Sequence, residues 1–368
     1  MLVREDLNVP LAGGKIEDDS RIKAAEPTIK RLQERDARVV VMSHLGRPQG
    51  RDESQSLKPV AERMGVEFAS DCVGPTAEEA VRRLRDGQVL LLENLRFHPE
   101  EEADDQGFAK QLAALGDLYV NDAFAAAHRA HASVVGVARL LPAYAGALML
   151  AELEALHRAL DEPQRPLVAI VGGAKVSTKS GVVRSLLPRV DTLILVGAMA
   201  NTFFKARGAE VGASLVEDAS LDDARAVERE AGEKLVLPVD SVCARKPEAG
   251  QETRVLGVDQ IPAGWMILDI GPRSVELFTE RLAGARTVVW NGPAGVAEIP
   301  EFSSGTRALG EAIVASGAFS LVGGGDTAAA VEKLGLSGFS HVSTGGGATL
   351  EYLEGRELPG VAVLQERK

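Results

Sequence analysis

The chain has 368 residues, which is too long for one ordinary hydrophobic core and suits two domains. Hydrophobic residues make up 45% and charged residues 26%, so a folded protein is expected. Aromatic residues make up only 4% and the net charge is −12, which argues against a base-stacking surface and against a dominant basic face for nucleic acid. A small anionic substrate is compatible with this charge, because a local basic cleft can lie inside an acidic protein.

The two cysteines, Cys72 and Cys243, are far apart, and neither lies in a CxxC pair or near a recognisable metal-ligand cluster in the sequence. This pattern favours a reducing compartment and argues against a disulfide scaffold or structural zinc. The chain opens as Met-Leu-Val-Arg-Glu-Asp, with no signal-peptide pattern, and no apolar run is long enough to span a bilayer. We therefore expect a cytoplasmic protein.

Short apolar runs alternate with helical patterns along the whole chain. The runs are continuous rather than alternating, as in parallel strands buried on both faces. The repeated strand–helix order predicts an α/β fold of two doubly wound parallel-sheet (Rossmann-like) domains. The predicted strands, besides a short one before residue 6, are 39–42, 89–92, 118–120, 168–171, 193–196, 288–290 and 321–322.

A helix is predicted over residues 146–161. Met149, Leu153, Leu156 and Leu160 recur there at helical spacing, and prolines follow the pattern. We interpret it as the connection between an N-terminal domain, 1–145, and a C-terminal domain, 162–352. On spacing alone, an ordinary surface helix explains the pattern equally well.

In the first half, polar residues cluster just after the strands, where open α/β sheets bind their ligands. Arginine presents a planar fork that matches phosphate and carboxylate oxygens, so several converging arginines would bind a small dianion. One such arginine alone would be read as a solvated surface charge. A histidine pair, His128 and His131, is a weaker indication of metal binding. The residues that form the predicted anion site are Asp6, Asn8, Arg21, His44, Arg47, Arg96 and Arg129.

In the second half, glycine turns follow the strands and begin helices. Backbone N–H groups at a helix N-terminus bind phosphate, and lysines add positive charge. Neither the P-loop motif nor a G-x-G-x-x-G motif after the first strand is found. The turns lie at 172–175, 292–295, 323–325 and 345–347, with Lys175, Lys179 and Asp326 in or beside them. They indicate a nucleotide site in which Asp326 would hold Mg²⁺.

Taken together, these motifs closely resemble those of the phosphoglycerate kinase family over essentially the whole chain. The matching runs are 6–10, 43–48, 93–98, 121–131, 172–179, 237–240, 265–272, 290–296, 323–326, 343–348 and 353–360. The resemblance implies reversible phosphoryl transfer between 1,3-bisphosphoglycerate and ADP, giving 3-phosphoglycerate and ATP, in a glycolytic monomer that binds neither nucleic acid nor membranes. It also implies that the tail, 353–368, packs back on the N-terminal domain.

The resemblance assigns roles to individual residues. The anion-site residues match the positions that bind 3-phosphoglycerate, and Arg21, Lys175 and Gly346 match catalytic positions. Arg21 and Lys175 would neutralise the transferring group, one from each domain, as the domains close around a hinge at 146–161. The nucleotide positions are matched by Lys175, Lys179, Asn291, Glu298 at the ribose, Gly324, Gly325, Asp326 and Thr327.

The chain departs from the family pattern at several uncharged positions. Alanines stand where the family usually has Gly-Thr, Met and Phe: Ala125, Ala126, Ala294 and Ala297. Glu5 stands where Val is usual, and Ala198 and Met199 follow Gly197 where a glycine run is usual. The lead-in before Asp6 is short, so either the start lies upstream or a shortened strand is tolerated.

Two other functions are compatible with parts of the pattern. A nicotinamide-dependent dehydrogenase would use a similar fold, but the missing dinucleotide motif argues against it. A non-catalytic protein could keep the fold, but the presence of Arg21, Lys175 and Asp326 argues against that.

Overall fold

The computed structural model describes residues 1–365; residues 366–368 of the predicted tail lie outside the described part. The chain forms two compact units. Unit 1 comprises Met1–Leu153 and the final segment from Glu357, and unit 2 comprises Glu154–Arg356. The division lies inside helix α6 (Ala147–Leu160), which confirms the helix predicted over 146–161.

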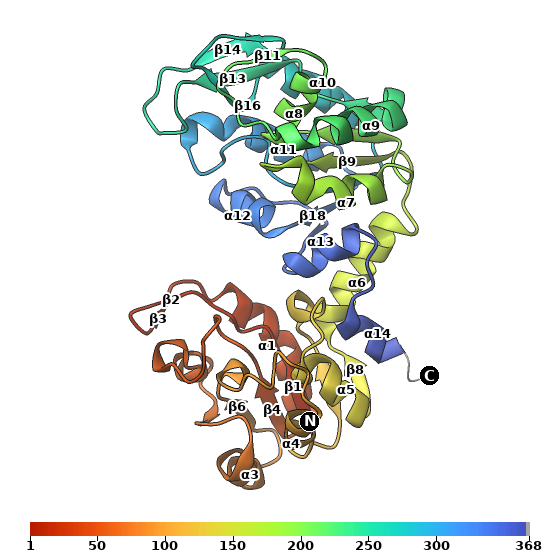
Figure 1. Ribbon diagram of the computed structural model, residues 1–368. Coiled ribbons are helices and arrows are strands. Elements are labelled where there is room, and N and C mark those ends of the chain that lie inside the picture. The colour runs from red at the N-terminus through yellow and green to blue at the C-terminus, as the bar shows by residue number, and fades with distance from the viewer. Residues whose placement is uncertain (366–368) are drawn as a thin grey trace. The chain divides into compact units, whose positions relative to one another are not determined.

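Unit 1 is built on a six-stranded parallel sheet in the order β5-β6-β4-β1-β7-β8 (Figure 1). In chain order, its strands are β1 (Leu2–Arg4), β4 (Val39–Met42), β5 (Glu67–Ala69), β6 (Val89–Leu92), β7 (Tyr119–Asn121) and β8 (Ala143–Ala145). A small hairpin, β2 (Leu11–Ala12) and β3 (Lys15–Ile16), follows β1. The predicted strands 39–42, 89–92 and 118–120 are confirmed, the last with a shift of one residue.

The sheet of unit 1 is buried on both faces because its strands are apolar throughout. Val39 and Val41 belong to one core, whereas Val40 and Met42 belong to the core on the opposite face. The final helix packs on this unit, since Gly360 N donates to Ala127 O at 2.8 Å. The helices are α1 (Ser20–Gln33), α2 (Lys58–Met64), α3 (Gly74–Arg83), α4 (Gln106–Ala113), α5 (Val137–Leu140) and α14 (Pro359–Gln365).

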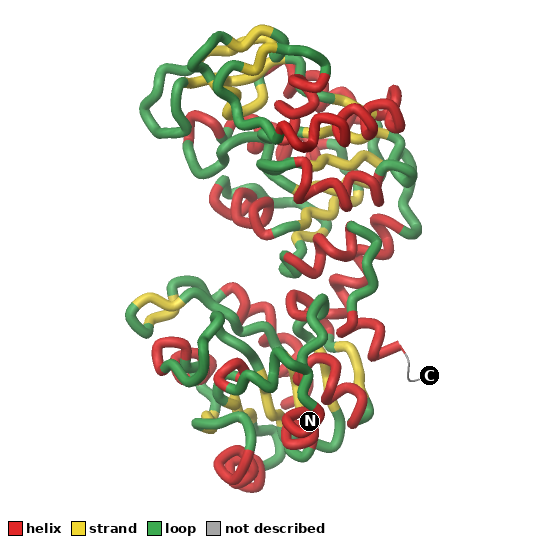
Figure 2. The backbone as a smooth tube through the Cα atoms, viewed as in Figure 1, coloured by secondary structure: helices red, strands yellow, loops and turns green. Residues whose placement is uncertain are grey.

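Unit 2 contains a second six-stranded parallel sheet, in the order β12-β10-β9-β17-β18-β19, and Figure 2 shows its strands lying among helices. The strands are β9 (Leu167–Val171), β10 (Thr192–Leu195), β12 (Leu235–Val236), β17 (Thr287–Asn291), β18 (Phe319–Gly323) and β19 (His341–Val342). The helices are α7 (Val176–Leu186), α8 (Met199–Ala206), α9 (Leu221–Ala231), α10 (Pro272–Ala283), α11 (Ser304–Ala315), α12 (Gly325–Lys333) and α13 (Gly347–Leu353). The strands predicted in this half are confirmed within two residues at each end.

Unit 2 also carries a small antiparallel sheet that the sequence pattern did not predict. Its order is β14 (Arg254–Gly257), β13 (Asp240–Ala244), β16 (Met266–Ile270), and the pair β11 (Glu210–Val211) and β15 (Gln260–Ile261) lies nearby (Figure 1). Among the residues described, no helix is both long enough and apolar enough to cross a membrane.

Candidate active site

In unit 1, His44 lies at the carboxyl end of the parallel sheet, where the charges of four arginines act on it. The His44 side chain is buried, and its Nδ1 lies 3.0 Å from a guanidinium nitrogen of Arg4. Burial holds the pKa of His44 well below its usual value, and the charges of Arg4, Arg96, Arg129 and Arg21 lower it further. His44 is therefore neutral at pH 7, and the positive charge of this site comes from the arginines.

The pKa of a second histidine, His131, is lowered by the same group of positive charges. Burial, followed by the charges of Arg96, Arg4 and Arg129, lowers the pKa of His131 to about 4. Because neither His44 nor His131 gains a proton at neutral pH, both rings add hydrogen-bonding capacity without adding charge. The site is thus suited to an anion that needs several fixed cations around it.

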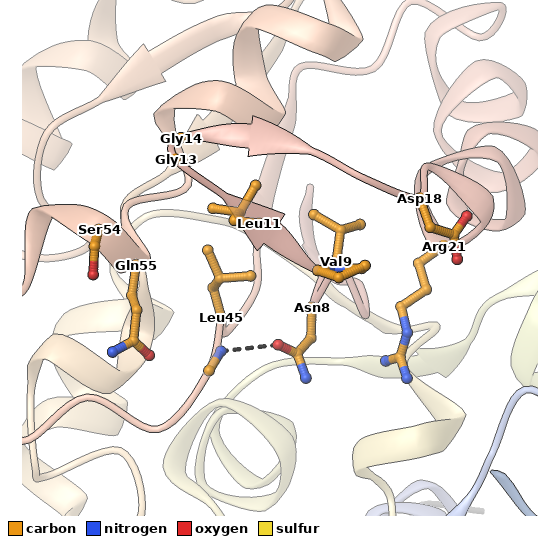
Figure 3. A pocket seen from close by; sticks show the side chains of 12 residues that line it. Asn8, Val9, Leu11, Gly13, Gly14, Asp18, Arg21, Leu45, Ser54 and Gln55 are labelled. Atoms are coloured by element: carbon orange, nitrogen blue, oxygen red, sulfur yellow. Dashed lines mark hydrogen bonds between the residues drawn. The ribbon is translucent and has the colours of Figure 1, made fainter. Parts of the chain in front are cut away.

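The segment that follows β1 positions the polar end of this site. Asp6 pairs with Arg21 at the start of α1, and Asp6 Oδ1 also accepts a hydrogen bond from Asn8 N at 3.2 Å. Asn8 Oδ1 accepts one from Gly46 N at 2.8 Å, which ties the first loop to the loop after β4. A cavity of about 800 Å³ lies against Asn8, Arg21 and Leu45, and Figure 3 shows the two polar side chains extending in the same direction.

The remaining predicted anion-site residues differ in how firmly they are held. Arg96 is buried on the short helix η2 (Leu95–Phe97); its Nη1 donates to Gly46 O at 2.6 Å, and its Nε lies 2.9 Å from Glu102 Oε1. Arg129 is half-buried and donates to His128 Nε2 at 3.1 Å. Arg47 is exposed, and no contact ties it to the others within the part of the chain that the structure describes.

Sequence reasoning missed Arg4, which lies at the centre of this site. Arg4 is 1% exposed, and its Nε donates to Ser133 Oγ at 3.0 Å. Ser133 Oγ in turn donates to the buried carboxylate of Glu101 at 2.6 Å. The sequence did contain a signal for Arg4: it is a charged residue within a strand that is otherwise apolar on both faces. A charge is buried in such a strand only when it has polar or charged partners.

In unit 2, the glycine turns that follow β9 and β17 lie against each other. Gly172 N donates to Asn291 O at 2.8 Å. A Cβ on Gly172 would lie 2.4 Å from Pro293 O, and a Cβ on Gly292 would lie 2.2 Å from Gly172 O. Glycine is therefore required at both positions, since any larger residue would push the two turns apart.

Lys179 and Asn291 connect three of these turns. Lys179, on α7, donates to Asn291 Oδ1 at 2.6 Å, and Asn291 Nδ2 donates to Gly323 O at 2.9 Å. Burial lowers the pKa of Lys179, while the nearby carboxylates of Asp326 and Glu354 act in the opposite direction. A half-buried cation with one neutral partner is available to an anionic ligand.

The turn after β18 begins helix α12. Gly324 is its N-cap, with φ of +92°, and a Cβ there would lie 2.7 Å from Asn291 Nδ2. Asp326 is exposed in the first turn of α12. Thr327 is buried instead: its hydroxyl accepts from Gly292 N at 2.7 Å and donates to Gly323 O at 2.8 Å. The Thr327 side chain therefore holds the turns together.

The remaining predicted residues of unit 2 are Lys175 and Glu298, predicted for the nucleotide, and Gly346, predicted to be catalytic. Lys175 is the exposed N-cap residue of α7, and Glu298 is exposed in the segment after β17. Gly346, with φ of +50°, is the N-cap of α13. One amide of the first turn of α7 is already engaged, because Ser177 N donates to a Glu217 carboxylate oxygen at 2.8 Å. The lysine side chains of this segment add positive charge for a ligand.

One expectation from the sequence is wrong. Cys72 was expected to lie far from metal-ligand residues, but the fold places it with Asp71 and His98, whose ligand atoms all lie within 4.8 Å of one another. The reason is topological: Asp71 and Cys72 follow β5, His98 follows β6 and η2, and β5 and β6 are parallel neighbours. Residues 26 positions apart therefore meet at one edge of the sheet.

Comparison with known proteins gives concordant results. The family model described as phosphoglycerate kinase matches residues 1–356. Phosphoglycerate kinases of Pelotomaculum thermopropionicum and Rubrobacter xylanophilus are each 55% identical to the chain, with 100% of the chain and 96% of each relative covered.

Solved structures give the same result. The phosphoglycerate kinase of Coxiella burnetii matches with a TM-score of 0.91 and 45% identity, covering 100% of this chain and 96% of that one. The phosphoglycerate kinase of Pyrococcus horikoshii matches with a TM-score of 0.87 and 36% identity, covering 99% and 95%.

Proposed function

Since the chain belongs to the phosphoglycerate kinase family, we propose that unit 1 binds 3-phosphoglycerate in the arginine-rich site and that unit 2 binds the nucleotide at its glycine turns. The reaction is reversible phosphoryl transfer between 1,3-bisphosphoglycerate and ADP. The observation that carries the assignment of the substrate is the arginine cluster near His44: Arg4 contacts His44 Nδ1 at 3.0 Å, and the charges of three more arginines also act on His44. That arrangement matches a small molecule with both phosphate and carboxylate groups.

In unit 1, the proposed roles follow from how each side chain is held. Arg96 and Arg129 bind the phosphate of 3-phosphoglycerate, assisted by Arg47, which is free to move because it is exposed. His44, being neutral, donates or accepts a hydrogen bond. Asp6 and Asn8 orient the substrate hydroxyl. The proposed 3-phosphoglycerate residues are therefore Asp6, Asn8, Arg21, His44, Arg47, Arg96 and Arg129.

In unit 2, the lysines of α7 and the start of α12 hold the nucleotide phosphates. Lys179 is positioned by Asn291, and the Gly324 turn leaves the first amides of α12 open to a phosphate. Glu298 binds the ribose. The proposed nucleotide residues are Lys175, Lys179, Asn291, Glu298, Gly324, Gly325, Asp326 and Thr327, the last through its backbone.

Asp326 is the residue that would hold Mg²⁺. Protein Mg²⁺ sites use one or two carboxylates together with substrate phosphates and water, and an exposed carboxylate in the first turn of a phosphate-binding helix fits that pattern. When bound, Mg²⁺ would neutralise phosphate charge. Lys179 lies close enough to Asp326 for the two charges to interact, and it would add positive charge at the same phosphates.

Phosphoryl transfer in this reaction depends on charge stabilisation more than on acid–base catalysis. In the direction of ATP synthesis the leaving group is a carboxylate, which departs without a proton, so the neutral state of His44 is no obstacle. Arg21 and Lys175 stabilise the charge that develops on the transferring group, and backbone donors at Gly346 assist. Arg21 is suited to this role because it is anchored by Asp6 while remaining partly exposed.

These roles require movement of the two units. Phosphoryl transfer needs reacting atoms about 3–3.5 Å apart. Because the proposed ligands belong to different units, we propose that the units approach each other when both ligands are bound, with bending at α6, where the division between the units lies. We also propose that the enzyme is a cytoplasmic monomer, which analytical ultracentrifugation and cell fractionation would test.

A coupled assay tests the function directly. Purified protein with Mg-ATP should form ADP only when 3-phosphoglycerate is present, and omission of Mg²⁺ should abolish turnover. A test for nicotinamide reduction with the same preparation should be negative. Equal ADP formation with unrelated carboxylate acceptors, such as acetate or lactate, would contradict the assignment.

A further inference from the structure

Three potential metal ligands of different chemical types lie together at one edge of the unit 1 sheet. They are the carboxylate of Asp71, the thiol of Cys72 and the imidazole of His98. His98 Nε2 lies 2.8 Å from Asp71 Oδ1, and this oxygen also accepts from Cys72 N at 2.7 Å. The three side chains are thus already oriented toward a common point.

The three side chains differ in their exposure to solvent. The Cys72 side chain is fully buried in the unit 1 core, whereas the side chains of His98 and Asp71 are 31% and 38% exposed. The ring of Phe108 packs on the His98 ring with 5.2 Å between centroids. An ion could therefore enter between His98 and Asp71 and would find the sulfur atom at the inner end of the site.

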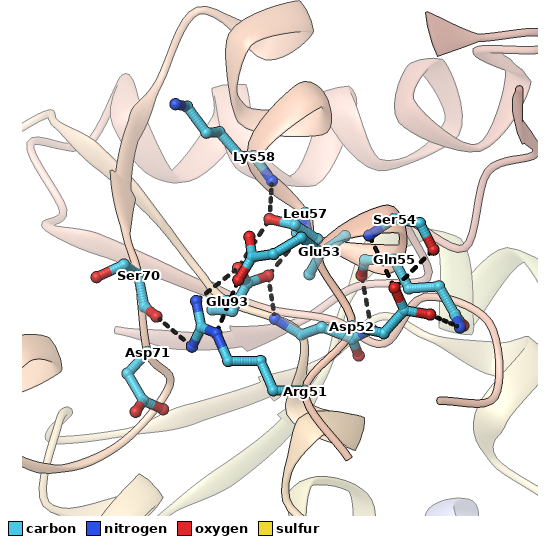
Figure 4. Close-up of polar contacts among 12 residues, drawn as sticks. Arg51, Asp52, Glu53, Ser54, Gln55, Leu57, Lys58, Ser70, Asp71 and Glu93 are labelled. Carbon is cyan, nitrogen blue, oxygen red and sulfur yellow. Dashed lines mark hydrogen bonds and ion pairs between the residues drawn. The ribbon is translucent and has the colours of Figure 1, made fainter. Parts of the chain in front are cut away.

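The electrostatic surroundings favour a cation. Besides Asp71, the carboxylates of Glu101 and Glu93 act on Cys72. The nearest cation, Arg51, is directed elsewhere: it donates to Glu53 at 2.8 Å and to Ser70 O at 3.1 Å, and lies 3.9 Å from Glu93 (Figure 4). The partners of Asp71 Oδ1 are thus His98 and Cys72 N, and an incoming ion would replace the contact with His98.

From this geometry we infer that Asp71, Cys72 and His98 form a binding site for a borderline-soft divalent metal ion such as Zn²⁺, separate from the Mg²⁺ bound with the nucleotide. Sulfur and nitrogen ligands select Zn²⁺ over Mg²⁺. Tetrahedral zinc with bonds of about 2.0–2.3 Å holds its ligand atoms roughly 3.3–3.8 Å apart, so the side chains need to move only about 1 Å. Water completes the coordination.

Binding displaces one proton. Cys72 loses its thiol proton to solvent. The single ring proton of a neutral His98 moves from Nε2 to Nδ1, which leaves the Nε2 lone pair for the metal and releases no further proton. Burial raises the pKa of Cys72, so the thiol is protonated at neutral pH.

The site has a structural consequence for the anion site. His98 directly follows η2, which carries Arg96, and Asp71 and Cys72 belong to the neighbouring loop. A bound ion would join these two segments and limit the movement of Arg96. The ion would affect the position of Arg96 and would not contact the substrate, since none of its ligands belongs to the proposed 3-phosphoglycerate residues.

Cobalt(II) is a suitable probe because thiolate ligation produces a near-ultraviolet sulfur-to-cobalt charge-transfer band. The full chain, first treated with chelator, is titrated with CoCl₂ at pH 8 and then with ZnCl₂. We expect one cobalt ion per chain to produce the band, and zinc to abolish it. Cobalt bound at the oxygen ligands of Asp326 would not produce it.

Variants identify the ligands. Cys72→Ser should remove the band, and Cys243→Ser, the matched change at the other buried free cysteine, should keep it. Because Cys72→Ser alters the core, His98→Gln at a partly exposed position is the second test, and it should weaken cobalt binding at least tenfold. A wild-type chain without the band, or a band that persists in Cys72→Ser, would overturn the inference.

Discussion

The buried carboxylates of Glu5 and Asp122 lie just beyond the ends of two neighbouring parallel strands, β1 and β7. They directly follow Arg4 and Asn121, which pair in the register of β1 and β7. Both Glu5 oxygens and Asp122 Oδ2 lack a hydrogen-bond partner within the described part of the chain. Burial raises the pKa of Glu5 well above its usual value, and the Asp122 charge raises it further.

Replacing Glu5 by Val should therefore stabilise the protein. An unpartnered buried polar group costs about 1–3 kcal/mol, and Val is an apolar residue that suits a buried strand end. We expect the free energy of unfolding at pH 7.5, measured by urea denaturation, to rise by about this amount. Glu67→Val, on the exposed side of β5, is the control and should change it little. A loss of stability in Glu5→Val would contradict this interpretation.

The effect of Glu5→Val should depend on pH. The pKa of Glu5 is higher in the folded state than its ordinary value of 4.5, so the folded state holds the proton more tightly than the unfolded state does. The contribution of Glu5 to the free energy of unfolding should therefore fall as the pH rises above about 4.5. The difference between variant and wild type should be larger at pH 8 than at pH 5. A difference that narrows toward pH 8 would show that Glu5 is not the responsible group.

Lys179 should act mainly on the nucleotide. It is positioned by Asn291, and hydrogen bonds to charged groups contribute about 1.5–3 kcal/mol, which corresponds to roughly 10- to 100-fold in affinity. Lys179→Ala should raise the KM for ATP by this factor and leave that for 3-phosphoglycerate within a few-fold. Lys205→Ala, which removes a lysine paired with Asp218 on the surface of unit 2, should leave both unchanged. An increase in the KM for 3-phosphoglycerate alone would refute the assignment.

The backbone at Gly324 should tolerate no side chain. With φ of +92° and Asn291 Nδ2 only 2.7 Å from the Cβ position, Gly324→Ala should displace the turn that begins α12. We expect ATP binding, measured by calorimetry, to weaken at least tenfold. Gly335→Ala is the control, because that glycine also has a positive φ, +63°, but no atom lies within 4 Å of the Cβ position. Equal affinities in the two variants would contradict this role.

Much of the fold could be predicted because the parallel strands are continuous apolar runs, such as 168–171, which are visible directly in the sequence. The antiparallel sheet could not, since β13 and β16 contain Asp240, Ser241 and Asp269, and their partners are fixed by tertiary contacts. Most charged side chains of the candidate site follow strands and were predicted on that basis. Arg4 was missed because it lies within a strand, and the proximity of Cys72 to His98 depends on strand order, which spacing in the sequence does not reveal.

Closure of the two units should require both ligands. Each ligand is proposed to contact mainly one unit, so neither alone has much differential affinity for a closed state. Small-angle scattering of the free protein, of each binary complex and of the ternary complex would compare the radii of gyration. We expect a clear contraction only in the ternary complex. The same radius in all four states would contradict closure.

The central claim is that Arg21 of unit 1 and Lys175 of unit 2 act on the same phosphoryl group. The most direct measurement is the rate of the transfer step in single-turnover rapid-quench experiments with saturating 3-phosphoglycerate and Mg-ATP. Arg21→Ala and Lys175→Ala should each slow this step by about 10²–10³-fold, while substrate affinities change far less and the Lys23→Ala control remains normal. A near-normal transfer rate in either alanine variant at Arg21 or Lys175 would contradict the account.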